Sequence, residues 1–338
     1  MILTEIKNLG ASSNIRIAVI GCGYWGKNLV RAFSEIGCLA AISDSNPKLA
    51  GDLSEGYKVK HENFEGILKN KNIDAVAIAT PAATHYDLAK AALLAGKDVF
   101  VEKPVSLNLD NADDLVKIAD QKNKILMVGH LLQYHPGFLK LKEMVVNNDL
   151  GNLQYIYSNR LNLGKFRKEE NILWSFAPHD VSMILNLFQS VPERVTAIGS
   201  SYLQSKIADV TTTHLHFSEG KSAHIYVSWL HPYKEQKLVV IGDKGMAVFD
   251  DGKDWDNKLS FYAHKVQWRD DLPIPDPAES ECVGIEKAEP LKLEVEHFIE
   301  SVSKRKAPRT DGREGKMVLS VLDAAERSME LNATVDIC

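Results

Sequence analysis

The sequence has few cysteines and no long apolar run. Its 338 residues include four cysteines, none in a CxxC pair, so we expect neither a disulfide framework nor a structural zinc site. No apolar segment approaches the roughly 20 residues that a membrane-spanning helix needs. Residues 1–13 also lack the basic start and apolar stretch of a secretory signal. We therefore expect a cytoplasmic protein without a membrane partner.

The sequence also lacks a strong charge excess, an internal repeat and a low-complexity segment. Its formal net charge of -5 argues against a general nucleic-acid binder. The hydrophobic share of 45% and the charged share of 25% are those of an ordinary globular protein. A chain of this length has room for about two domains.

The first 130 residues alternate short apolar runs with helical patterns. The expected strands are Ile15–Ile20, Leu39–Ser43, Ile73–Ala79, Asp98–Val101 and Ile125–Val128. Strands that alternate with helices predict an α/β fold, here an N-terminal Rossmann domain with a doubly wound parallel sheet. Thr84 is expected to cap the helix that follows the third of these strands.

After residue 130 the pattern changes to strands that alternate in polarity and are joined by short turns. This predicts an α+β C-terminal domain with a largely antiparallel, open sheet, in which residues 273–277 form a loop. We place the boundary between the two domains at residue 130, with a first domain at residues 1–130 and a second at residues 131–310. The last helix, about 311–331, is expected to pack back near the first domain.

A glycine-rich turn, Gly21-Cys22-Gly23-Tyr24-Trp25-Gly26, stands between the first strand and the first helix. This is the context in which a GxGxxG motif binds a dinucleotide: Gly21 permits a tight turn, Gly23 lets backbone amides approach a pyrophosphate, and Gly26 lets helix and strand pack closely. Asp44 follows the second strand, where an acid accepts hydrogen bonds from the adenosine ribose. A carboxylate there repels a 2′-phosphate, so NAD is favoured over NADP.

Glu102-Lys103-Pro104 ends the strand that begins at Asp98. A lysine at the carboxyl end of a buried parallel strand stands where open α/β sheets bind their ligands. Its alternative role is that of a strand-end lysine which extends to water. If the sheet binds a dinucleotide, we expect Lys103 to face the reacting carbon.

Several motifs together resemble one family, that of glucose–fructose oxidoreductase, inositol dehydrogenase and MocA. They are the glycine turn, Ala79-Thr80-Pro81, the Glu102-Lys103-Pro104 triplet and the change to an antiparallel sheet. Segments 129–136, 158–164 and 174–180 look like its sugar-nucleotide branch. The resemblance implies NAD-dependent oxidation of the 3-hydroxyl of a UDP-N-acetylhexosamine or its uronic acid, in polysaccharide biosynthesis. It extends the cofactor site to Tyr24, Trp25, Thr80, Pro81, His85, Glu102 and Lys103.

The same resemblance implies two catalytic residues, Lys103 and His179. Alcohol oxidation needs a hydride acceptor and a base. We favour His179 as the base and Lys103 as the group that polarises the hydroxyl, with Lys103 as the alternative base. His179 precedes an apolar helical run, so we expect it near a helix start, where the helix dipole lowers its pKa. Ser175 occupies the position where much of the family carries an aspartate, and Asp180 is a weak substitute because adjacent helical residues point apart.

The proposed substrate contacts are polar or aromatic residues of the second half: Lys103, Tyr134, His135, Asn159, Arg160, Asn162, Arg167, Trp174, His179 and Asp180. Arg160 and Arg167 belong to a basic segment that suits a diphosphate or uronate, or that is only a solvated charge run. For His214, His216 and His224 we expect a hairpin that points His224 away from the other two, and hence no metal site. The exposed face of that sheet is expected to form a homodimer or homotetramer.

Two other functions remain open at this point. A dehydrogenase of a free sugar or polyol, similar to inositol dehydrogenase, needs no cations for a diphosphate. A dinucleotide-sensing regulator could use the same fold without catalysis, although intact Lys103 and His179 argue against it.

Overall fold

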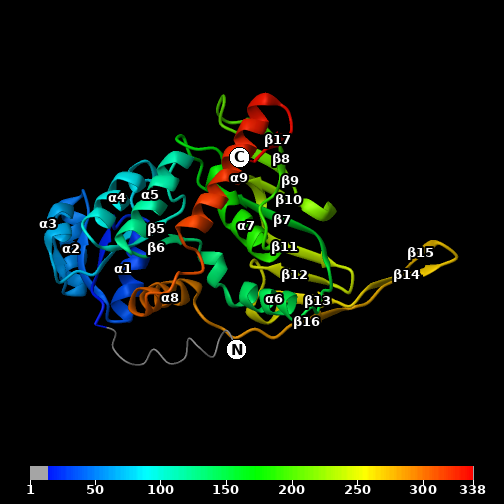
Figure 1. Cartoon of the computed structure of the whole chain (residues 1–338), viewed down its shortest axis with the longest axis horizontal. Helices are drawn as coiled ribbons and strands as arrows, with labels where there is room; N and C mark the ends of the chain where they lie inside the picture. The colour runs from blue at the N-terminus through cyan, green and yellow to red at the C-terminus, as the bar shows by residue number, and fades with distance from the viewer. Residues whose placement is uncertain (1–13, 338) are drawn as a thin grey trace. The chain divides into compact units, whose positions relative to one another are not determined.

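The computed structural model describes residues 14–337, which fall into two compact units. The first unit contains the described residues up to Leu131 together with Glu289–Leu319, and the second contains Leu132–Ala288 and the described residues from Ser320 onward. Figure 1 shows the elements of both. No helix within residues 14–337 combines the length and apolar character needed to cross a membrane.

The first unit is built on a six-stranded sheet in the order β3-β2-β1-β4-β5-β6. All of its strand pairs are parallel, and the order is that of a doubly wound dinucleotide-binding sheet. The prediction of a Rossmann sheet is therefore confirmed. Its elements are β1 (Ile17–Ile20), α1 (Gly26–Glu35), β2 (Leu39–Ser43), α2 (Pro47–Tyr57), β3 (Lys60–His61), α3 (Phe64–Lys69), β4 (Ala75–Ile78), α4 (His85–Leu94), β5 (Asp98–Glu102), α5 (Leu109–Lys122), β6 (Leu126–Gly129), α8 (Pro290–Lys304) and the start of α9 (Gly312–Leu331).

Strands β1 and β4 are buried along their whole length, which explains why they read as unbroken apolar runs. Helix α8 packs beside α1, and α4 packs beside α5. The ring of Phe298 on α8 meets those of Phe33 on α1 and Phe100 on β5 edge to face, with centroids 6.5 and 5.7 Å apart. This aromatic cluster fixes α8 on the same face as the glycine turn's helix.

One helix start in this unit differs from the expectation. Thr84 stands at the N-cap position of α4, but its side chain caps no helical N–H. Its hydroxyl instead donates to the carbonyl oxygen of Pro81 at 2.8 Å and lies 2.7 Å from the hydroxyl of Thr80. The predicted cap is therefore wrong. A short 3₁₀ turn at Ala82–Thr84 precedes α4, and the Thr84 hydroxyl bonds to the carbonyl oxygen of Pro81 just before that turn.

The second unit carries a nine-stranded sheet in the order β16-β13-β12-β11-β7-β10-β9-β8-β17. Every pair is antiparallel except β7 with β10, so the prediction of a largely antiparallel sheet is confirmed. Its elements are α6 (Pro136–Val146), β7 (Leu153–Leu163), α7 (Ile172–Phe188), β8 (Arg194–Ser200), β9 (Val210–His216), β10 (Ser222–Ser228), β11 (Leu230–Gly242), β12 (Met246–Asp250), β13 (Leu259–Tyr262), β14 (Lys265–Arg269), β15 (Leu272–Asp276), β16 (Ser280–Cys282), the end of α9 and β17 (Val335–Asp336).

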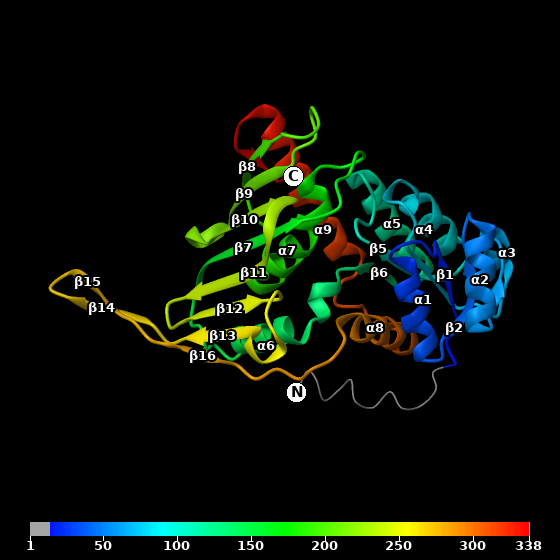
Figure 2. The ribbon, with the colours of Figure 1, turned by 180° about the vertical axis from the view of Figure 1, so that it is seen from behind.

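Helix α7 packs on β7, β9 and β10, which leaves the other face of these strands without a covering helix in the described chain. Residues 273–277 were expected to form a loop, but most of them belong to strand β15. Figure 2 shows β14 and β15 as a two-stranded ribbon that extends from this sheet. Pro273 and Pro275 fit there because strands of a two-stranded ribbon leave half of their N–H groups unpaired.

Candidate functional site

The glycine turn connects β1 to α1 at the carboxyl edge of the first sheet. Gly21 has a φ of 83° and donates its N–H to the carbonyl oxygen of Ser43 at 2.8 Å. A Cβ on Gly26 would lie 1.9 Å from the carbonyl oxygen of Gly21, so only glycine lets the helix start this close to the strand. A Cβ on Gly23 would have no atom within 4 Å. Gly23 therefore leaves open space above the turn.

Asp44 holds the other side of this turn. Its Oδ2 accepts a hydrogen bond from the N–H of Cys22 at 2.6 Å, and its Oδ1 accepts one from Asn46 at 2.8 Å. Each oxygen keeps a further lone pair, since an ionised carboxylate accepts about four hydrogen bonds. Asp44 is thus oriented by the backbone and still able to bind the two hydroxyls of a ribose.

Glu102 and Lys103 follow at the end of β5. The indole Nε1 of Trp25, in the glycine turn, donates to Glu102 Oε1 at 2.5 Å, and the N–H of Lys103 donates to the same carboxyl group. Burial raises the pKa of Glu102 to about 7, against the lowering effects of the Trp25 bond and of the Lys103 charge. The turn and the triplet are thereby joined by one carboxyl group that titrates near neutrality.

His85 joins two other parts of this edge. It is only 1% exposed, and its Nδ1 and Nε2 lie 2.7 Å from the carbonyl oxygen of Pro104 and 2.9 Å from that of Thr80. Burial lowers its pKa. Because both ring nitrogens face backbone oxygens, the ring is positioned to hold the Thr80 loop against the triplet. Its direct contact with a cofactor stays a prediction.

These residues fit NAD. The space over Gly23, the start of α1 and the oriented Asp44 together offer the amides, the helix dipole and the ribose acceptor that a dinucleotide needs. Tyr24 is 85% exposed on the turn, and Pro81 is exposed on the neighbouring loop. The predicted NAD-binding residues of the first unit thus lie along the ends of β1, β2, β4 and β5.

His179 belongs to the second unit, and its helical position corrects the sequence-based expectation. Helix α7 begins at Ile172, where Asn171 caps it by accepting the N–H of Trp174, so His179 is the eighth helical residue. The favourable field of a helix N-terminus is confined to about the first turn. His179 therefore lies beyond that field, and its predicted place near the helix start is wrong. Ser175 lies one turn earlier on the same helix face.

Arg160 and Asp180 form a buried pair in the second unit. Arg160 donates Nε to Asp180 Oδ2 at 2.6 Å and Nη2 to Oδ1 at 3.0 Å, and Ser158 donates its hydroxyl to Oδ1 at 2.5 Å. Asp180 is 1% exposed. The two charged groups bond to each other, and this ion pair joins β7 to α7. Contact of either residue with a substrate stays a prediction.

The asparagines predicted for the substrate lie on opposite faces of β7. Asn162 shares the face of Arg160, toward α7, since side chains on a strand alternate. Asn159 points to the other face and donates its amide to Glu235 at 2.7 Å. On that evidence the two do not form one cluster. Arg167 is exposed and pairs with Glu170 at 3.7 Å.

Trp174 also has a partner inside the second unit, since its indole Nε1 donates to Glu326 on α9. The amide of Asn171 donates to the other oxygen of Glu326 at 3.1 Å. Burial raises the pKa of Glu326, while these two hydrogen bonds lower it. Trp174 thus helps to fix the start of α7 on α9, and its contact with a sugar stays a prediction.

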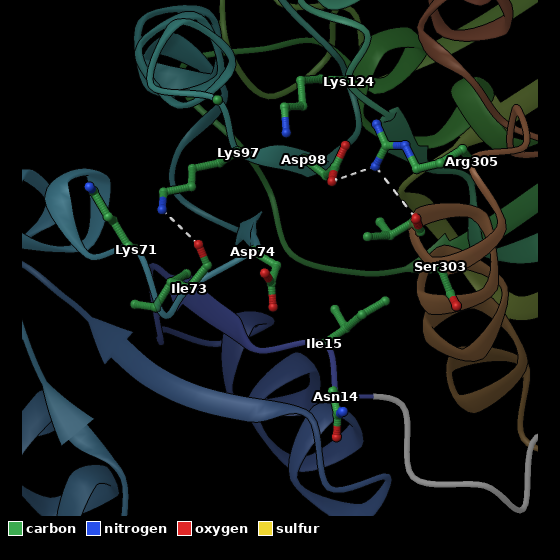
Figure 3. A pocket seen from close by; sticks show the side chains of 12 residues that line it. Asn14, Ile15, Lys71, Ile73, Asp74, Lys97, Asp98, Lys124, Ser303 and Arg305 are labelled. Atoms are coloured by element: carbon green, nitrogen blue, oxygen red, sulfur yellow. Dashed lines mark hydrogen bonds and ion pairs between the residues drawn. The ribbon is translucent and has the colours of Figure 1, made fainter.

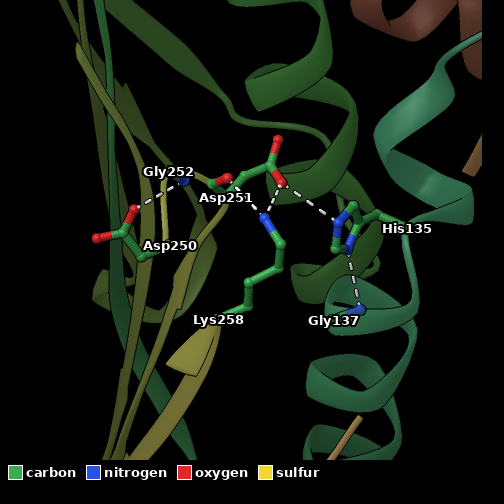
Figure 4. Close-up of polar contacts among 6 residues, drawn as sticks. All are labelled: His135, Gly137, Asp250, Asp251, Gly252 and Lys258. Carbon is green, nitrogen blue, oxygen red and sulfur yellow. Dashed lines mark hydrogen bonds and ion pairs between the residues drawn. The ribbon is translucent and has the colours of Figure 1, made fainter. Parts of the chain in front are cut away.

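Tyr134 and His135 are both buried just before α6. His135 accepts the N–H of Gly137 at Nδ1 (3.0 Å), which leaves Nε2 to donate to Asp251 Oδ1 at 3.3 Å (Figure 4). Lys258 donates to the same oxygen at 2.7 Å. Although burial raises the pKa of Asp251, these two partners lower it to about 2. The His135 ring therefore caps α6 and joins it to the segment after β12.

The three histidines of the sheet differ from their expected arrangement. His224 pairs with His214, and Ser222 pairs with His216, so all three side chains share one face. The predicted register is wrong because the connection from Phe217 to Lys221 is longer than a two-residue turn. Tyr157 stacks on His224 with centroids 5.3 Å apart. Within residues 14–337, no group of three or more histidine, cysteine or acidic side chains could hold a metal ion.

A cavity of about 550 Å³ lies at the opposite edge of the first sheet, where β1, β4 and β5 begin. Figure 3 shows Lys97 bonded to the carbonyl oxygen of Ile73 and Asp98 bonded to Arg305. These contacts join the residues at the amino ends of β4 and β5 to each other and to the end of α8. Since the glycine turn and Lys103 stand at the carboxyl ends, this cavity is separate from the candidate site.

Sequence reasoning missed Glu294, a buried acid on α8 whose charge interacts with Glu102. It also missed Asp251, Lys258 and Glu326, which hold residues of the predicted site. A lone acid inside a run of apolar helical positions is the signal that could have revealed Glu294.

Comparisons with known proteins identify a family for both units of the chain. Residues 15–130 match the GFO_IDH_MocA oxidoreductase family, NAD-binding Rossmann fold, and residues 138–248 match a GFO/IDH/MocA C-terminal domain. UDP-N-acetylglucosamine 3-dehydrogenase of Acidithiobacillus ferrooxidans is 25% identical over 91% of this chain and 95% of its own. Myo-inositol 2-dehydrogenase of Thermotoga maritima is 28% identical over 95% and 98%.

A solved structure of the Acidithiobacillus ferrooxidans UDP-N-acetylglucosamine 3-dehydrogenase superposes with a TM-score of 0.83 at 24% identity, over 94% of this chain and 98% of that one. At this identity the likeness shows the fold. The expectation of NAD as cofactor is confirmed by the family match.

Proposed function

Because the chain belongs to the GFO/IDH/MocA oxidoreductase family, we propose that it oxidises the 3-hydroxyl of a UDP-N-acetylhexosamine or its uronic acid. Bound NAD⁺ supplies the hydride acceptor for such a reaction. The single observation that carries the oxidoreductase assignment is the edge where Trp25, Glu102 and Lys103 are joined to the glycine turn. The similarity to a UDP-N-acetylglucosamine 3-dehydrogenase supports the choice of substrate.

Lys103 and His179 are the proposed catalytic residues. The Lys103 ammonium polarises the hydroxyl and stabilises the alkoxide that forms as its proton leaves. His179 is the base that takes this proton, with Lys103 as the alternative base. Ser175 can only offer a hydrogen bond to the imidazole, where an aspartate would also stabilise its charged form. We therefore expect Lys103 to carry a large share of the alkoxide charge.

A polyol or free-sugar dehydrogenase is the second candidate, and the similarity to inositol dehydrogenases favours it. The buried Arg160–Asp180 pair also favours it, because this pair removes one cation from those expected to bind a diphosphate. A dinucleotide-sensing regulator is the third candidate and requires that no sugar be oxidised.

Turnover on matched substrates separates these functions. NADH formation is measured with UDP-N-acetylglucosamine, its uronic acid, N-acetylglucosamine and myo-inositol at equal concentrations. The proposal predicts turnover on a UDP-sugar and little on the free compounds. Turnover on myo-inositol or a free sugar alone would replace it with the second candidate, and tight NAD binding without any turnover would favour the third.

We further propose that the uncovered face of the second sheet joins copies of this chain into a homodimer or homotetramer. Ile198 is 65% exposed and Tyr155 is 41% exposed there, beside the three histidines. Such apolar side chains on an open sheet suit burial against a second sheet. Sedimentation tests this: an Ile198→Lys variant should be a monomer, and an unchanged mass would contradict the proposal.

A further inference from the structure

The ribbon formed by β14 and β15 has one apolar face and one mixed face. Residues that stand opposite each other on antiparallel strands point to the same side. The register sets Val266 opposite Pro275 and Trp268 opposite Pro273, so these four apolar side chains cover one face. The other face carries the remaining opposite pairs, which are Lys265 with Asp276, Gln267 with Ile274, and Arg269 with Leu272.

The apolar face of this ribbon is exposed. Every residue of the two strands is exposed, and the exposed fraction is 70% for Trp268 and 56% for Val266. Figures 1 and 2 both show the ribbon extending away from the sheet of its own unit. A two-stranded ribbon alone in water is at best marginally stable, and its apolar side chains contribute to stability only when they are buried. We call residues 264–278 the arm, and its apolar face needs a surface to pack on.

The uncovered face of the nine-stranded sheet offers such a surface. Across β8, β9 and β10 the register aligns Ile198, Thr212 and Tyr226 in one row. The next row contains His214 and His224, and the ring of Tyr157 stacks on that of His224. Aliphatic and aromatic side chains of this kind pack well against a tryptophan and prolines.

The arm and this surface also differ in charge. Residues 265–281 contain five acidic residues and two basic ones. Strands β8, β9 and β10 contain Arg194 and three histidines but no acidic residue. The acids at the margins of this surface have neighbours of opposite charge or amide donors: Asp336 stands opposite Arg194, and Glu235 contacts Lys237 and Asn159. An acidic arm is therefore complementary to the three central strands.

The order of the strands makes a second copy the partner that fits. The arm leaves the sheet between β13 and β16, at one edge, whereas β8, β9 and β10 lie toward the other edge. The arm thus extends away from the matching surface of its own chain. When two such sheets face each other across a two-fold axis that runs along the strands, their strand orders are reversed. Each arm then lies beside β8, β9 and β10 of the other copy, and the two contacts are identical.

We propose that the arm of one copy packs its Val266 and Trp268 face on the uncovered sheet face of a second copy, over β8, β9 and β10. The turn at Asp270 and Asp271 then lies toward Arg194 and the histidines of that copy. This rests on the assembly through the sheet face proposed above and names the segment that completes it. It does not depend on which sugar the protein oxidises.

Removal of the arm tests the proposal without disturbing the sheet. Tyr262 on β13 stands opposite Ser280 on β16, so Ala263 and Glu279 face each other and a two-residue turn can join them. In the test variant, Asn-Gly replaces residues 264–278. Sedimentation equilibrium should show the dissociation constant between copies rising at least about tenfold, as when a tryptophan anchor is lost from an interface. An unchanged constant, or a wild type that is a monomer at micromolar concentration, overturns the proposal.

Two single substitutions separate the faces of the arm. Trp268 and Leu272 are exposed to nearly the same extent, 70% and 66%, but lie on opposite faces. Trp268→Ser should weaken association about tenfold, whereas Leu272→Ser, the matched control, should change it less than about twofold. Equal effects of the two substitutions contradict the proposal.

The turn of the arm can lose its charge and keep its backbone. Asp270 and Asp271 have positive φ values of 49° and 62°, which asparagine also adopts readily. Added salt should weaken association of the wild type more than that of the double variant Asp270→Asn, Asp271→Asn. The same salt dependence in both proteins contradicts the placement of the turn near Arg194 and the histidines.

A cross-linking experiment identifies the surface that the arm contacts. The photoreactive residue p-benzoylphenylalanine takes the place of Trp268, and ¹⁵N-labelled and unlabelled protein are mixed before irradiation. Cross-linked peptides should join two chains and come from residues 194–228. Cross-links within one chain, or to any other surface, overturn the proposal. If Ile198→Lys gives monomers while the cross-links map elsewhere, assembly through the sheet face stands and only the placement of the arm fails.

Discussion

Replacement of Glu294 by glutamine should make the protein's stability less dependent on pH. The folded state keeps this acid protonated, whereas in the unfolded chain its pKa returns to the ordinary value of 4.5. Since the folded pKa is raised, the contribution to stability is complete below pH 4.5 and is lost as the pH rises toward the folded pKa. Holding the proton therefore costs folding free energy above pH 4.5, and the cost grows with pH by at most about 1.36 kcal/mol per pH unit until the folded pKa is reached.

Glutamine does not titrate, so it avoids this cost at every pH. The free energy of unfolding of Glu294→Gln minus that of the wild type should rise with pH above pH 5, with a slope of at most about 1.4 kcal/mol per pH unit. Any constant penalty for burying the amide shifts this difference without changing its slope. The measurement is urea unfolding followed by circular dichroism at pH 5, 6, 7 and 8.

The matched control is Glu300→Gln on the same helix, where the carboxylate reaches Lys304 at 2.6 Å near the surface. Its difference from the wild type should be nearly constant above pH 5, since an exposed pair contributes little. If the Glu294→Gln difference is equally constant, Glu294 is not a protonated acid in the folded protein, and the reasoning from its burial without hydrogen-bond partners fails.

Two further substitutions test the site and its support. Gly26→Ala places a Cβ 1.9 Å from the carbonyl oxygen of Gly21, so we expect NAD affinity to fall at least about tenfold in calorimetry. The control Gly23→Ala has no atom near its Cβ and should unfold at the wild-type temperature. NAD binding by Gly26→Ala that equals that of the wild type would contradict the packing argument. Asp180→Ala leaves the buried Arg160 guanidinium without its carboxylate, so urea unfolding should show a loss of about 3–5 kcal/mol. A loss under 1 kcal/mol would mean that water reaches this pair.

The first sheet could be predicted because its central strands β1, β4, β5 and β6 are almost wholly buried. Continuous apolar runs such as Ala75–Ile78 have few alternative structures, and the glycine turn needs its residues for steric reasons alone. The proposed role of Asp44 followed from its place at a strand end, and that of Glu102 followed from the resemblance to the family. What the sequence did not reveal is how their carboxyl groups are held, because hydrogen bonds between Trp25 and Glu102 span distant parts of the chain.

The second unit was less predictable, because the local sequence around its helix starts and its prolines fits more than one structure. The apolar run after His179 suggested a helix that starts near this residue, but the cap at Asn171 places the start seven residues before it. Prolines in β15 suggested a loop, although an isolated ribbon accepts them. The pairing of Arg160 with Asp180 could not be seen either, because it depends on the packing of α7 against β7.

The proposed catalytic role of Lys103 is tested most directly by a comparison of NAD binding and NADH formation in wild-type protein and in Lys103→Ala. The variant should bind NAD within a few-fold of the wild type, because the glycine turn and Asp44 are intact. It should form almost no NADH with any UDP-N-acetylhexosamine or other sugar that the wild type oxidises. NADH formation by Lys103→Ala at close to the wild-type rate would contradict it.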